Sequence, residues 1–166
     1  DAGERIESII GFTREYQNFG IDSSDWIPVG RAIDSARYEV SCGDVTVENR
    51  VDEDIEIYAD PIIRKVFSTL IENAIRHGDT ITRIVFSTKK KGNQLLLVCE
   101  DDGTGVADEF KERIFEHGFG NHTGLGLFFI REILAITSLT IHECGEMGKG
   151  ARFEIRIPAD AFRRIP

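Results

Sequence analysis

Three side chains that could bind a phosphate-bearing ligand lie close together near the middle of the chain. Asn73, Arg76 and His77 stand three and four residues apart, so a helix would place them on one face. A neutral amide beside groups that carry or can carry positive charge suits a phosphate chain bridged by a metal ion. A solvated helix end with favourable cations near its C-terminus explains the same residues. The pattern leaves both interpretations open.

A helix is expected over residues 60–78 and carries these side chains. Asp60 is a good N-cap, Pro61 suits the first helical position, and Gly78 follows the last apolar residue of the repeat. Apolar residues recur every three or four positions, which predicts a largely buried helix. They are Ile62, Ile63, Val66, Phe67, Leu70, Ile71, Ala74 and Ile75. The polar residues therefore sit at the end of a core element.

An acidic, glycine-containing turn is expected where a central strand ends, at residues 100–105. Asp101 could accept a hydrogen bond from an exocyclic amine such as N6 of adenine. Gly103 and Gly105 would allow a flat ligand to approach the backbone closely. A solvated Asp–Gly turn is the alternative.

A loop rich in glycine, residues 118–126, runs into a helix expected over 126–138. Free backbone N–H groups and the positive helix end would converge there, which is typical of a phosphate-binding loop. The loop has neither the Gly-Lys-Ser/Thr of a P-loop nor a GxGxxG after a strand. A mobile loop with glycine at the start of a helix is the alternative.

Composition limits the possible partners. The 166 residues suit one domain, or one domain with a short appendage, and the net charge of −9 argues against an extended nucleic-acid surface. The three cysteines lack metal-ligand spacing and suggest a reduced, cytosolic protein in which they mostly pack. We find no signal peptide and no apolar run of membrane-spanning length. An anionic ligand must be held locally, by helix ends, a divalent cation or a few side chains.

The other segments are predicted from periodicity and turn residues. Helices are expected over 5–19 and 29–41 with a linker at 21–28, and a short helical turn over 108–115. Hairpins are expected to pair 45–50 with 55–58, 82–90 with 94–100, and 139–144 with 151–157.

Taken in order, the motifs resemble the N, G1, F, G2 and G3 boxes of the catalytic ATP-binding domain of sensor histidine kinases, in the Bergerat (GHKL) superfamily. The matching residues are 73–77, 101–105, Phe115 and Phe119, 123–127, and 148–150 with Phe153. The resemblance covers about residues 45–158. It implies an α/β fold, a two-layer sandwich with a mixed, largely antiparallel sheet packed on helices. Nucleotide would lie between helix 60–78 and the glycine-rich lid.

The resemblance also implies roles for individual residues. Asn73 matches the ligand of the Mg²⁺ that bridges the phosphates of ATP, Arg76 faces the phosphates, and His77 packs against nucleotide. Asp101 matches the acceptor for adenine N6, with Gly103 and Gly105 beside the base. The lid hinge and the helix start near the phosphates are Thr123, Gly124, Leu125, Gly126 and Leu127.

Three departures from the family pattern predict weaker nucleotide binding. Thr69 stands where many histidine kinases have a second Asn, and Ala151 stands where Thr or Ser is usual. The lid is short, and its titratable side chains are Glu116, His117 and His122. Related ATPases and serine kinases have a Glu at the position of Thr69 that activates the attacking water or hydroxyl. Thr cannot act as that base, which favours a histidine kinase.

The resemblance therefore implies that the chain donates the γ-phosphoryl of Mg-ATP to a histidine on a dimerisation helix that precedes it. Residues 1–20 would be the tail of that helix, 21–28 a linker, and 29–166 the catalytic ATP-binding domain; no residue of the chain is assigned as catalytic. Expected partners are the dimerisation and phosphoacceptor domain of the same protein, in a homodimer, and a downstream response regulator. The location would be cytoplasmic, with membrane anchoring of the parent left open. The alternative is a degenerate GHKL module that binds nucleotide or a partner without phosphotransfer.

Overall fold

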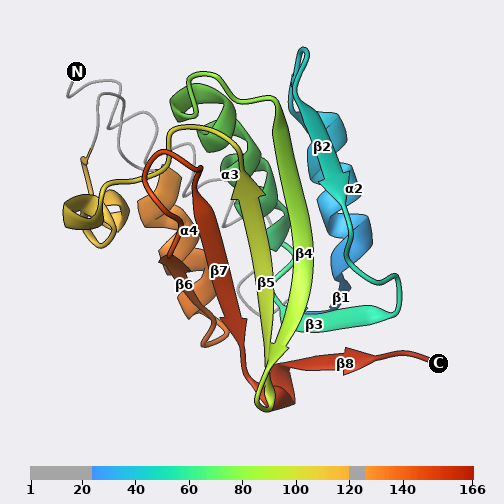
Figure 1. Cartoon of the computed structure of the whole chain (residues 1–166). Coiled ribbons are helices and arrows are strands. Elements are labelled where there is room, and N and C mark those ends of the chain that lie inside the picture. Colours follow the sequence, from blue (N-terminus) through green and yellow to red (C-terminus); the bar gives the residue numbers. More distant parts are fainter. Residues whose placement is uncertain (1–23, 120–125) are drawn as a thin grey trace, which may run out of the picture.

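The computed structural model describes residues 24–119 and 126–166, where helices cover one face of a five-stranded sheet (Figure 1). The helices are α2 (Val29–Glu39), α3 (Ile63–His77) and α4 (Gly126–Ala135). The strand order is β2-β4-β5-β7-β6. The bounds are β2 Thr46–Asn49, β4 Arg83–Lys91, β5 Gln94–Asp101, β6 Thr140–Glu143 and β7 Arg152–Ile157. Only the β2–β4 pair in this sheet is parallel. The expected two-layer α/β sandwich is confirmed.

A second, three-stranded sheet shows where local sequence patterns misled. Its order is β1-β3-β8, with β1 at Asp25–Pro28, β3 at Ile55–Ala59 and β8 at Phe162–Arg164. The predicted hairpin of 45–50 with 55–58 is wrong, because β2 and β3 belong to different sheets. The expected linker at 21–28 is partly wrong too, since Asp25–Pro28 pair with β3. The helix expected over 5–19 lies outside the described residues.

The acidic turn between β2 and β3 connects the two sheets instead of closing a hairpin. Arg164 of β8 binds Asp54 through Nη1 at 2.8 Å and Asp52 through Nη2 at 3.0 Å. These partners are more than a hundred residues apart in sequence. Alternation of side chains predicted the strands, but it could not identify partners so distant in the chain.

The predicted hairpins formed by residues 82–90 with 94–100 and by 139–144 with 151–157 are confirmed. The first closes at Gly92, with φ +62°. The turn expected over 108–115 forms two 3-10 turns, η1 (Asp108–Phe110) and η2 (Arg113–Phe115), and a third, η3 (Ala159–Ala161), precedes β8. Helix α4 is shorter than expected and ends at Ala135, because the N–H groups of residues 136–138 donate to carbonyls three residues earlier, and Ser138 then turns left-handed with φ +62°.

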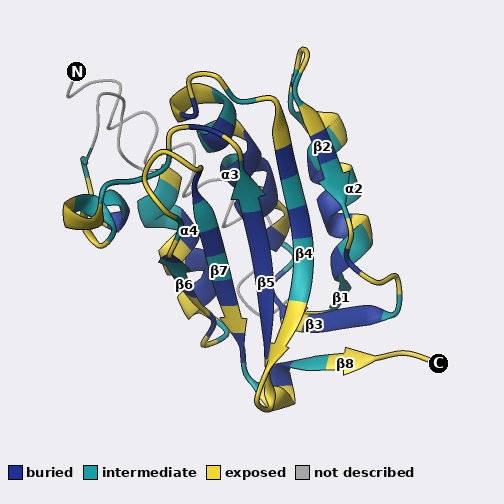
Figure 2. Ribbon diagram, in the orientation of Figure 1, coloured by how far each residue is buried: buried dark blue, intermediate teal, exposed yellow. Residues whose placement is uncertain are grey.

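Helix α3 is the central core element, although it begins later than expected. Ile63 N donates to the Asp60 carbonyl at 2.9 Å, and Ile62 N donates to Asp60 Oδ1 at 3.0 Å. Asp60 thus caps a tight turn ahead of the helix. Phe67 is fully buried and meets Phe86 of β4 edge-on, with ring centroids 6.1 Å apart. Figure 2 shows the buried stretch continuing through β5, which joins α3 in the core.

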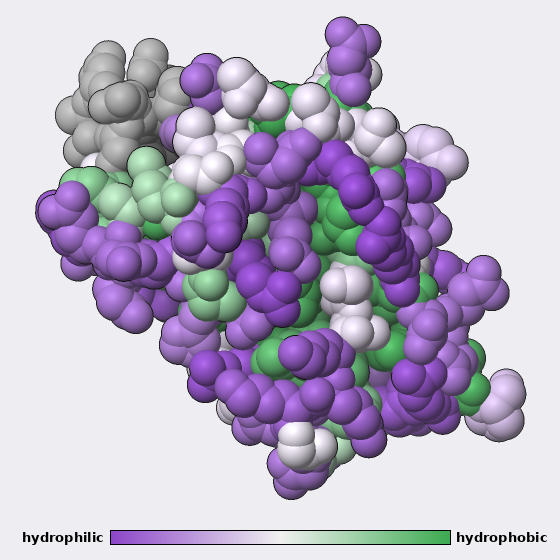
Figure 3. Space-filling model, viewed as in Figure 1, coloured by the Kyte–Doolittle hydropathy of each residue, from purple (hydrophilic) through white to green (hydrophobic). Residues whose placement is uncertain are grey.

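The sheet face opposite the helices carries polar side chains (Figure 3). Leu96 and Val98 point to this face, since they alternate with the core residues of β5, yet both are buried. Arg152 pairs with Glu100 at 2.9 Å and with Glu154 at 3.2 Å. Long charged side chains can cover apolar surface in this way while their ends stay in water.

The C-terminal end of α3 is pressed against the end of β5 by a contact between glycines. The helix stops at His77, and Gly78 has a right-handed φ of −73°, so left-handed backbone is not the reason for this glycine. The left-handed residue is Asp79, with φ +59°. A Cβ added to Gly103 would lie 2.7 Å from Gly78 Cα and 2.6 Å from its carbonyl oxygen. The two backbones therefore touch.

The loop between β6 and β7 reaches the same point. A Cβ on Gly150 would lie 1.9 Å from the Asp101 carbonyl oxygen, and Gly150 has a φ of +117°. Gly148 N also donates to the Thr104 carbonyl at 2.7 Å. We call the contacts of Gly78 with Gly103 and of Gly150 with Asp101 the glycine junction. It fixes a helix end, a strand end and a loop relative to one another.

Gly150→Ala should be far more damaging than Gly148→Ala, which serves as its control. Both glycines have positive φ, so each substitution carries roughly 1–2 kcal/mol of backbone strain. Gly148 faces open space, whereas an alanine at 150 must displace Asp101, which adds about 1–3 kcal/mol for overpacking. Urea unfolding would measure both. Equal losses of unfolding free energy would contradict the junction.

Candidate functional site

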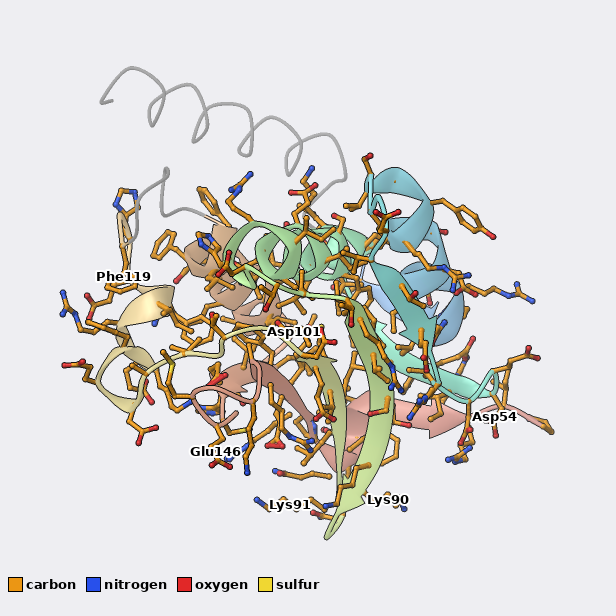
Figure 4. The ribbon with its side chains drawn as sticks, turned by 45° about the horizontal axis from the view of Figure 1, so that its top comes forward. Asp54, Lys90, Lys91, Asp101, Phe119 and Glu146 are labelled. Carbon is orange, nitrogen blue, oxygen red and sulfur yellow. The ribbon has the colours of Figure 1, made fainter. Side chains whose placement is uncertain are left out.

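Asp101 is the last residue of β5 and lies where that strand ends (Figure 4). Its Oδ1 accepts from Gly103 N at 2.9 Å and from Ala151 N at 3.1 Å. Both of the hydrogen bonds that this carboxylate makes within the described part of the chain go to Oδ1. Oδ2 is therefore the atom that can accept from a ligand, as expected of a carboxylate at this strand end.

Burial raises the pKa of Asp101, and the N–H groups of Gly103 and Ala151 offset part of that effect. The charges of Asp102 and Glu143 push the pKa in the same direction as burial. The ionised carboxylate is thus less stable than at an exposed position, and a ligand N–H aimed at Oδ2 would stabilise it. Protonation of Oδ2 would turn this acceptor into a donor.

Ala151 orients Asp101 without a side chain. Its N–H donates to Asp101 Oδ1, and its carbonyl accepts from Asp101 N at 3.0 Å. The departure from the family's usual Thr or Ser therefore leaves the carboxylate in place. What is missing is a hydroxyl for the ligand.

Gly103 and Gly105 have a packing role that was not expected, beside the predicted role next to a ligand, which stays a prediction. The space that a side chain would fill at 103 is occupied by the Gly78 backbone. At 105 a Cβ would lie 3.0 Å from the carbonyl oxygens of Glu146 and Gly150, and φ is +78°. Both glycines are thus required for packing of the protein itself, whether or not a ligand approaches.

Asp102 is a structural residue that sequence reasoning missed. Its carboxylate accepts from Thr82 N at 2.8 Å, from Arg83 N at 3.1 Å and from the Thr82 hydroxyl. The hydrogen bond from that hydroxyl is the main cause that lowers the pKa of Asp102. These bonds tie the α3–β4 loop to the end of β5. The sequence Asp101-Asp102-Gly103 does not indicate which of the two carboxylates faces the candidate site and which one holds the loop.

Asn73 lies on the side of α3 that faces the start of α4. Thr69 marks this side, because a Cβ on Gly126 would lie 3.2 Å from Thr69 Cγ2. Asn73 stands one turn further along the same face. It is half-buried, and its amide makes no side-chain hydrogen bond with any residue in 24–119 or 126–166. No described residue thus uses the Asn73 amide, which lies on the side of α3 near the first turn of α4, where a helix has N–H groups without partners inside the helix.

The remaining expected site residues are distributed around these two groups. Arg76 and His77 are exposed in the last turn of α3. Gly126 and Leu127 open α4, the first exposed and the second half-buried. Thr123, Gly124 and Leu125 lie outside the described residues.

The segment before the lid is anchored by aromatic contacts. Phe115 is buried and meets Phe153 of β7 edge-on, with ring centroids 6.2 Å apart. Phe119 lies further out (Figure 4), where it meets Phe110 at 5.7 Å and the Arg113 guanidinium lies 5.3 Å from its ring. The two phenylalanines thus differ in role: Phe115 belongs to the core and Phe119 to the partly exposed edge.

The described residues do not form a metal site made of protein side chains alone. Within the described ranges, no group of three or more His, Cys, Asp or Glu residues could hold a metal ion. A cation that keeps waters and binds phosphate oxygens needs fewer protein ligands, and the oxygen of the Asn73 amide suits it. All three cysteines are unpaired. None of the helices described here is long and apolar enough to cross a membrane.

Comparison with known proteins agrees with this geometry. Residues 59–161 match the family described as histidine kinase-, DNA gyrase B-, and HSP90-like ATPase. The alginate biosynthesis sensor protein KinB of Pseudomonas aeruginosa is 32% identical over 58% of this chain and 17% of its own length. The sensor histidine kinase CusS of Escherichia coli is 28% identical over 79% of this chain and 29% of its own length. The chain thus spans less than a third of either relative.

Solved structures share the fold. The mycobacterial sensor histidine kinase MprB superposes with a TM-score of 0.74 at 17% identity, over 86% of this chain and 99% of that one. Full-length ShkA in complex with AMPPNP superposes with a TM-score of 0.73 at 20% identity, over 86% of this chain and 32% of that one. The family match covers more than half of the residues. The chain belongs to the histidine kinase-, DNA gyrase B- and HSP90-like ATPase family, as a catalytic ATP-binding domain of the type found in sensor histidine kinases.

Proposed function

We propose that this domain binds Mg-ATP and supplies its γ-phosphoryl group to a histidine on a dimerisation helix of the same protein. The observation that carries the proposal is the placement of two available polar groups, Asp101 Oδ2 and the Asn73 amide, on elements that the glycine junction fixes together. An acceptor for a purine amine and a ligand for a phosphate-bound cation can then act on one nucleotide.

Each end of the nucleotide would be held by different chemistry. Asp101 would accept from N6 of adenine, which orients the base. Asn73, with Arg76 nearby on the exposed end of α3, would hold the Mg²⁺ and the phosphates. Bound Mg²⁺ neutralises charge on the phosphates, and positioning with charge neutralisation is most of what phosphoryl transfer requires.

Transfer to histidine fits the absence of a general base at position 69. The Thr69 side chain faces Gly126, and a hydroxyl cannot take a proton from water as a carboxylate does. Glu72 is exposed and lies about 100° from Asn73 around the helix. A histidine nucleophile is already largely neutral near pH 7 and needs less help. Its ring nitrogen would attack the γ-phosphorus while the bond to the ADP oxygen breaks.

The acceptor histidine is proposed to lie on another part of the protein. His142-Glu143 is the only His followed by an acidic residue in the chain, and it lies in strand β6, not on a helix. The dimerisation domain of a homodimeric parent would supply the acceptor, and a response regulator would receive the phosphoryl group. Departures at Thr69 and Ala151 also suit a degenerate module that binds without transfer, so that candidate is tested alongside.

Asn73→Asp and Asp101→Asn should each weaken binding of a fluorescent ATP analogue with Mg²⁺ at least about fivefold. At position 101 the NH₂ of the amide would replace the accepting Oδ2, and at position 73 the carboxylate would add a negative charge beside the phosphates. Each change should cost about 1–3 kcal/mol. Asn93→Asp at the hairpin tip and Asp44→Asn after α2 repeat the same chemical changes at exposed positions and should leave affinity unchanged. Saturable binding that all four variants retain would contradict the assigned site.

The transfer itself is tested by supplying the parent's dimerisation domain in trans, with ATP labelled at the γ-phosphate. We expect label on that domain that is labile to acid and stable to alkali, and none when Asn73 is changed to Asp. Nucleotide binding without phosphohistidine, in the presence of the acceptor, would favour the degenerate module. Acid-stable label would indicate a serine kinase, and steady release of phosphate a hydrolase.

A further inference from the structure

A buried ion pair next to the candidate site has no part in the chemistry above. Glu143, the last residue of β6, has a completely buried side chain, and Lys111, between η1 and η2, is half-buried, with its side chain 18% exposed. Lys111 Nζ pairs with Glu143 Oε1 and also donates to the Gly145 carbonyl at 2.8 Å. Burial of a charged pair is costly unless both members are well bonded, so this arrangement needs a reason.

The Glu143 carboxylate closes the base of the β6–β7 loop. Gly145 N donates to Oε1 at 3.1 Å, and Arg152 N donates to Oε2 at 3.1 Å. These two N–H groups come from the two sides of the loop, and Gly150 and Ala151 lie between them. One carboxylate therefore holds together the loop that forms one part of the glycine junction.

The same loop orients Asp101. Ala151, next to Arg152, donates its N–H to Asp101 Oδ1, and Gly150 lies against the Asp101 carbonyl. A continuous set of contacts thus runs from Lys111 through Glu143 and the β6–β7 loop to Asp101. Lys111 belongs to the segment that leads in sequence to the lid, so the pair also attaches that segment to the loop.

We propose that Lys111 is a positioning residue for nucleotide: by neutralising Glu143 it keeps the β6–β7 loop closed and holds Asp101 in the orientation that accepts from the purine. The proposal rests on the proposed function. The ionisable groups that respond to Glu143 are Asp101 on β5 and the Cys144 thiol beside it, and the charge of Glu143 raises the pKa of both. Lys111 is the cation paired with it. Without Lys111, an uncompensated carboxylate would remain next to Asp101.

Lys111→Met tests this idea because it keeps about the length of the side chain while it removes the charge and the hydrogen bonds of the ammonium group to Glu143 and Gly145. At pH 8 we expect about tenfold weaker binding of the fluorescent ATP analogue than in the unmodified chain. A buried carboxylate without its cation has a raised pKa and takes up a proton more easily. The ratio of the two affinities should therefore approach one as the pH falls to about 5.5.

A second substitution should rescue the first. In Lys111→Met/Glu143→Gln, the amide oxygen at the place of Oε2 can accept from Arg152 N and from Gly145 N, which lies 3.3 Å from Oε2, while the NH₂ donates to the Gly145 carbonyl in place of Lys111. We expect affinity within about twofold of the unmodified chain at both pH values. Lys149→Met is the control, because Lys149 is an exposed cation on the same loop and should not alter affinity. A double variant that folds and stays weak would overturn the proposal, as would a Lys111→Met loss that does not change with pH.

Amide hydrogen exchange separates this proposal from the function on which it rests. In the absence of nucleotide, Lys111→Met should speed exchange at Gly103 and Ala151, whose N–H groups bind Asp101, and the double variant should restore protection. Unchanged exchange at both amides would overturn the positioning role even if nucleotide binds. If the unmodified chain binds no nucleotide, the proposed function fails, and exchange still decides whether Lys111 positions Asp101.

Discussion

The arrangement of this domain depends on backbone contacts that leave no room for a side chain. Gly78 touches Gly103, and Gly150 touches Asp101, so a helix end, a strand end and a loop meet without adjustable groups between them. Side chains can change rotamer to absorb an error, but packed backbone cannot. The contacts therefore set the distance between Asn73 and Asp101. The surrounding hydrogen bonds orient side chains on backbone segments whose relative positions are already fixed.

The two functional groups take their relative position from this frame. Asp101 belongs to the junction itself, and Asn73 precedes Gly78 by five residues, or about 7.5 Å along the helix axis. Asp102 ties down the α3–β4 loop, while Phe115 packs the segment before the lid on β7. Because these parts are held without a ligand, binding loses less conformational freedom than it would in a loose site.

Much of the fold follows from patterns that are local in the sequence. The apolar repeat of α3 and the two-residue turn at Gly92 are signals of short range, and both are found as expected. Pairing between distant segments could not be predicted from the sequence. The patterns of β2 and β3 indicate that each is a strand, but they do not indicate which strand each one pairs with. Strand β8 was missed for the same reason, since its partner β3 lies about a hundred residues earlier.

In the site, residue types were easier to predict than the reasons for them. Asp101 was identified as an acceptor, and its free oxygen agrees with that role. Gly103 and Gly105 were assigned to ligand approach, which stays a prediction, and their need for contact between backbone segments was not foreseen. Glu143 gave a signal that could have been used, because it occupies an inward position in the alternation of β6. No local pattern pairs it with Lys111, since they are 32 residues apart.

The most direct test is a crystal structure of the chain with a non-hydrolysable ATP analogue and Mg²⁺. We predict that adenine N6 lies about 2.7–3.2 Å from Asp101 Oδ2 and that the Asn73 side-chain oxygen lies about 2.0–2.1 Å from the metal ion. A purine bound away from Asp101, or a bound purine whose metal and phosphates do not reach Asn73, would contradict a single site built on the glycine junction.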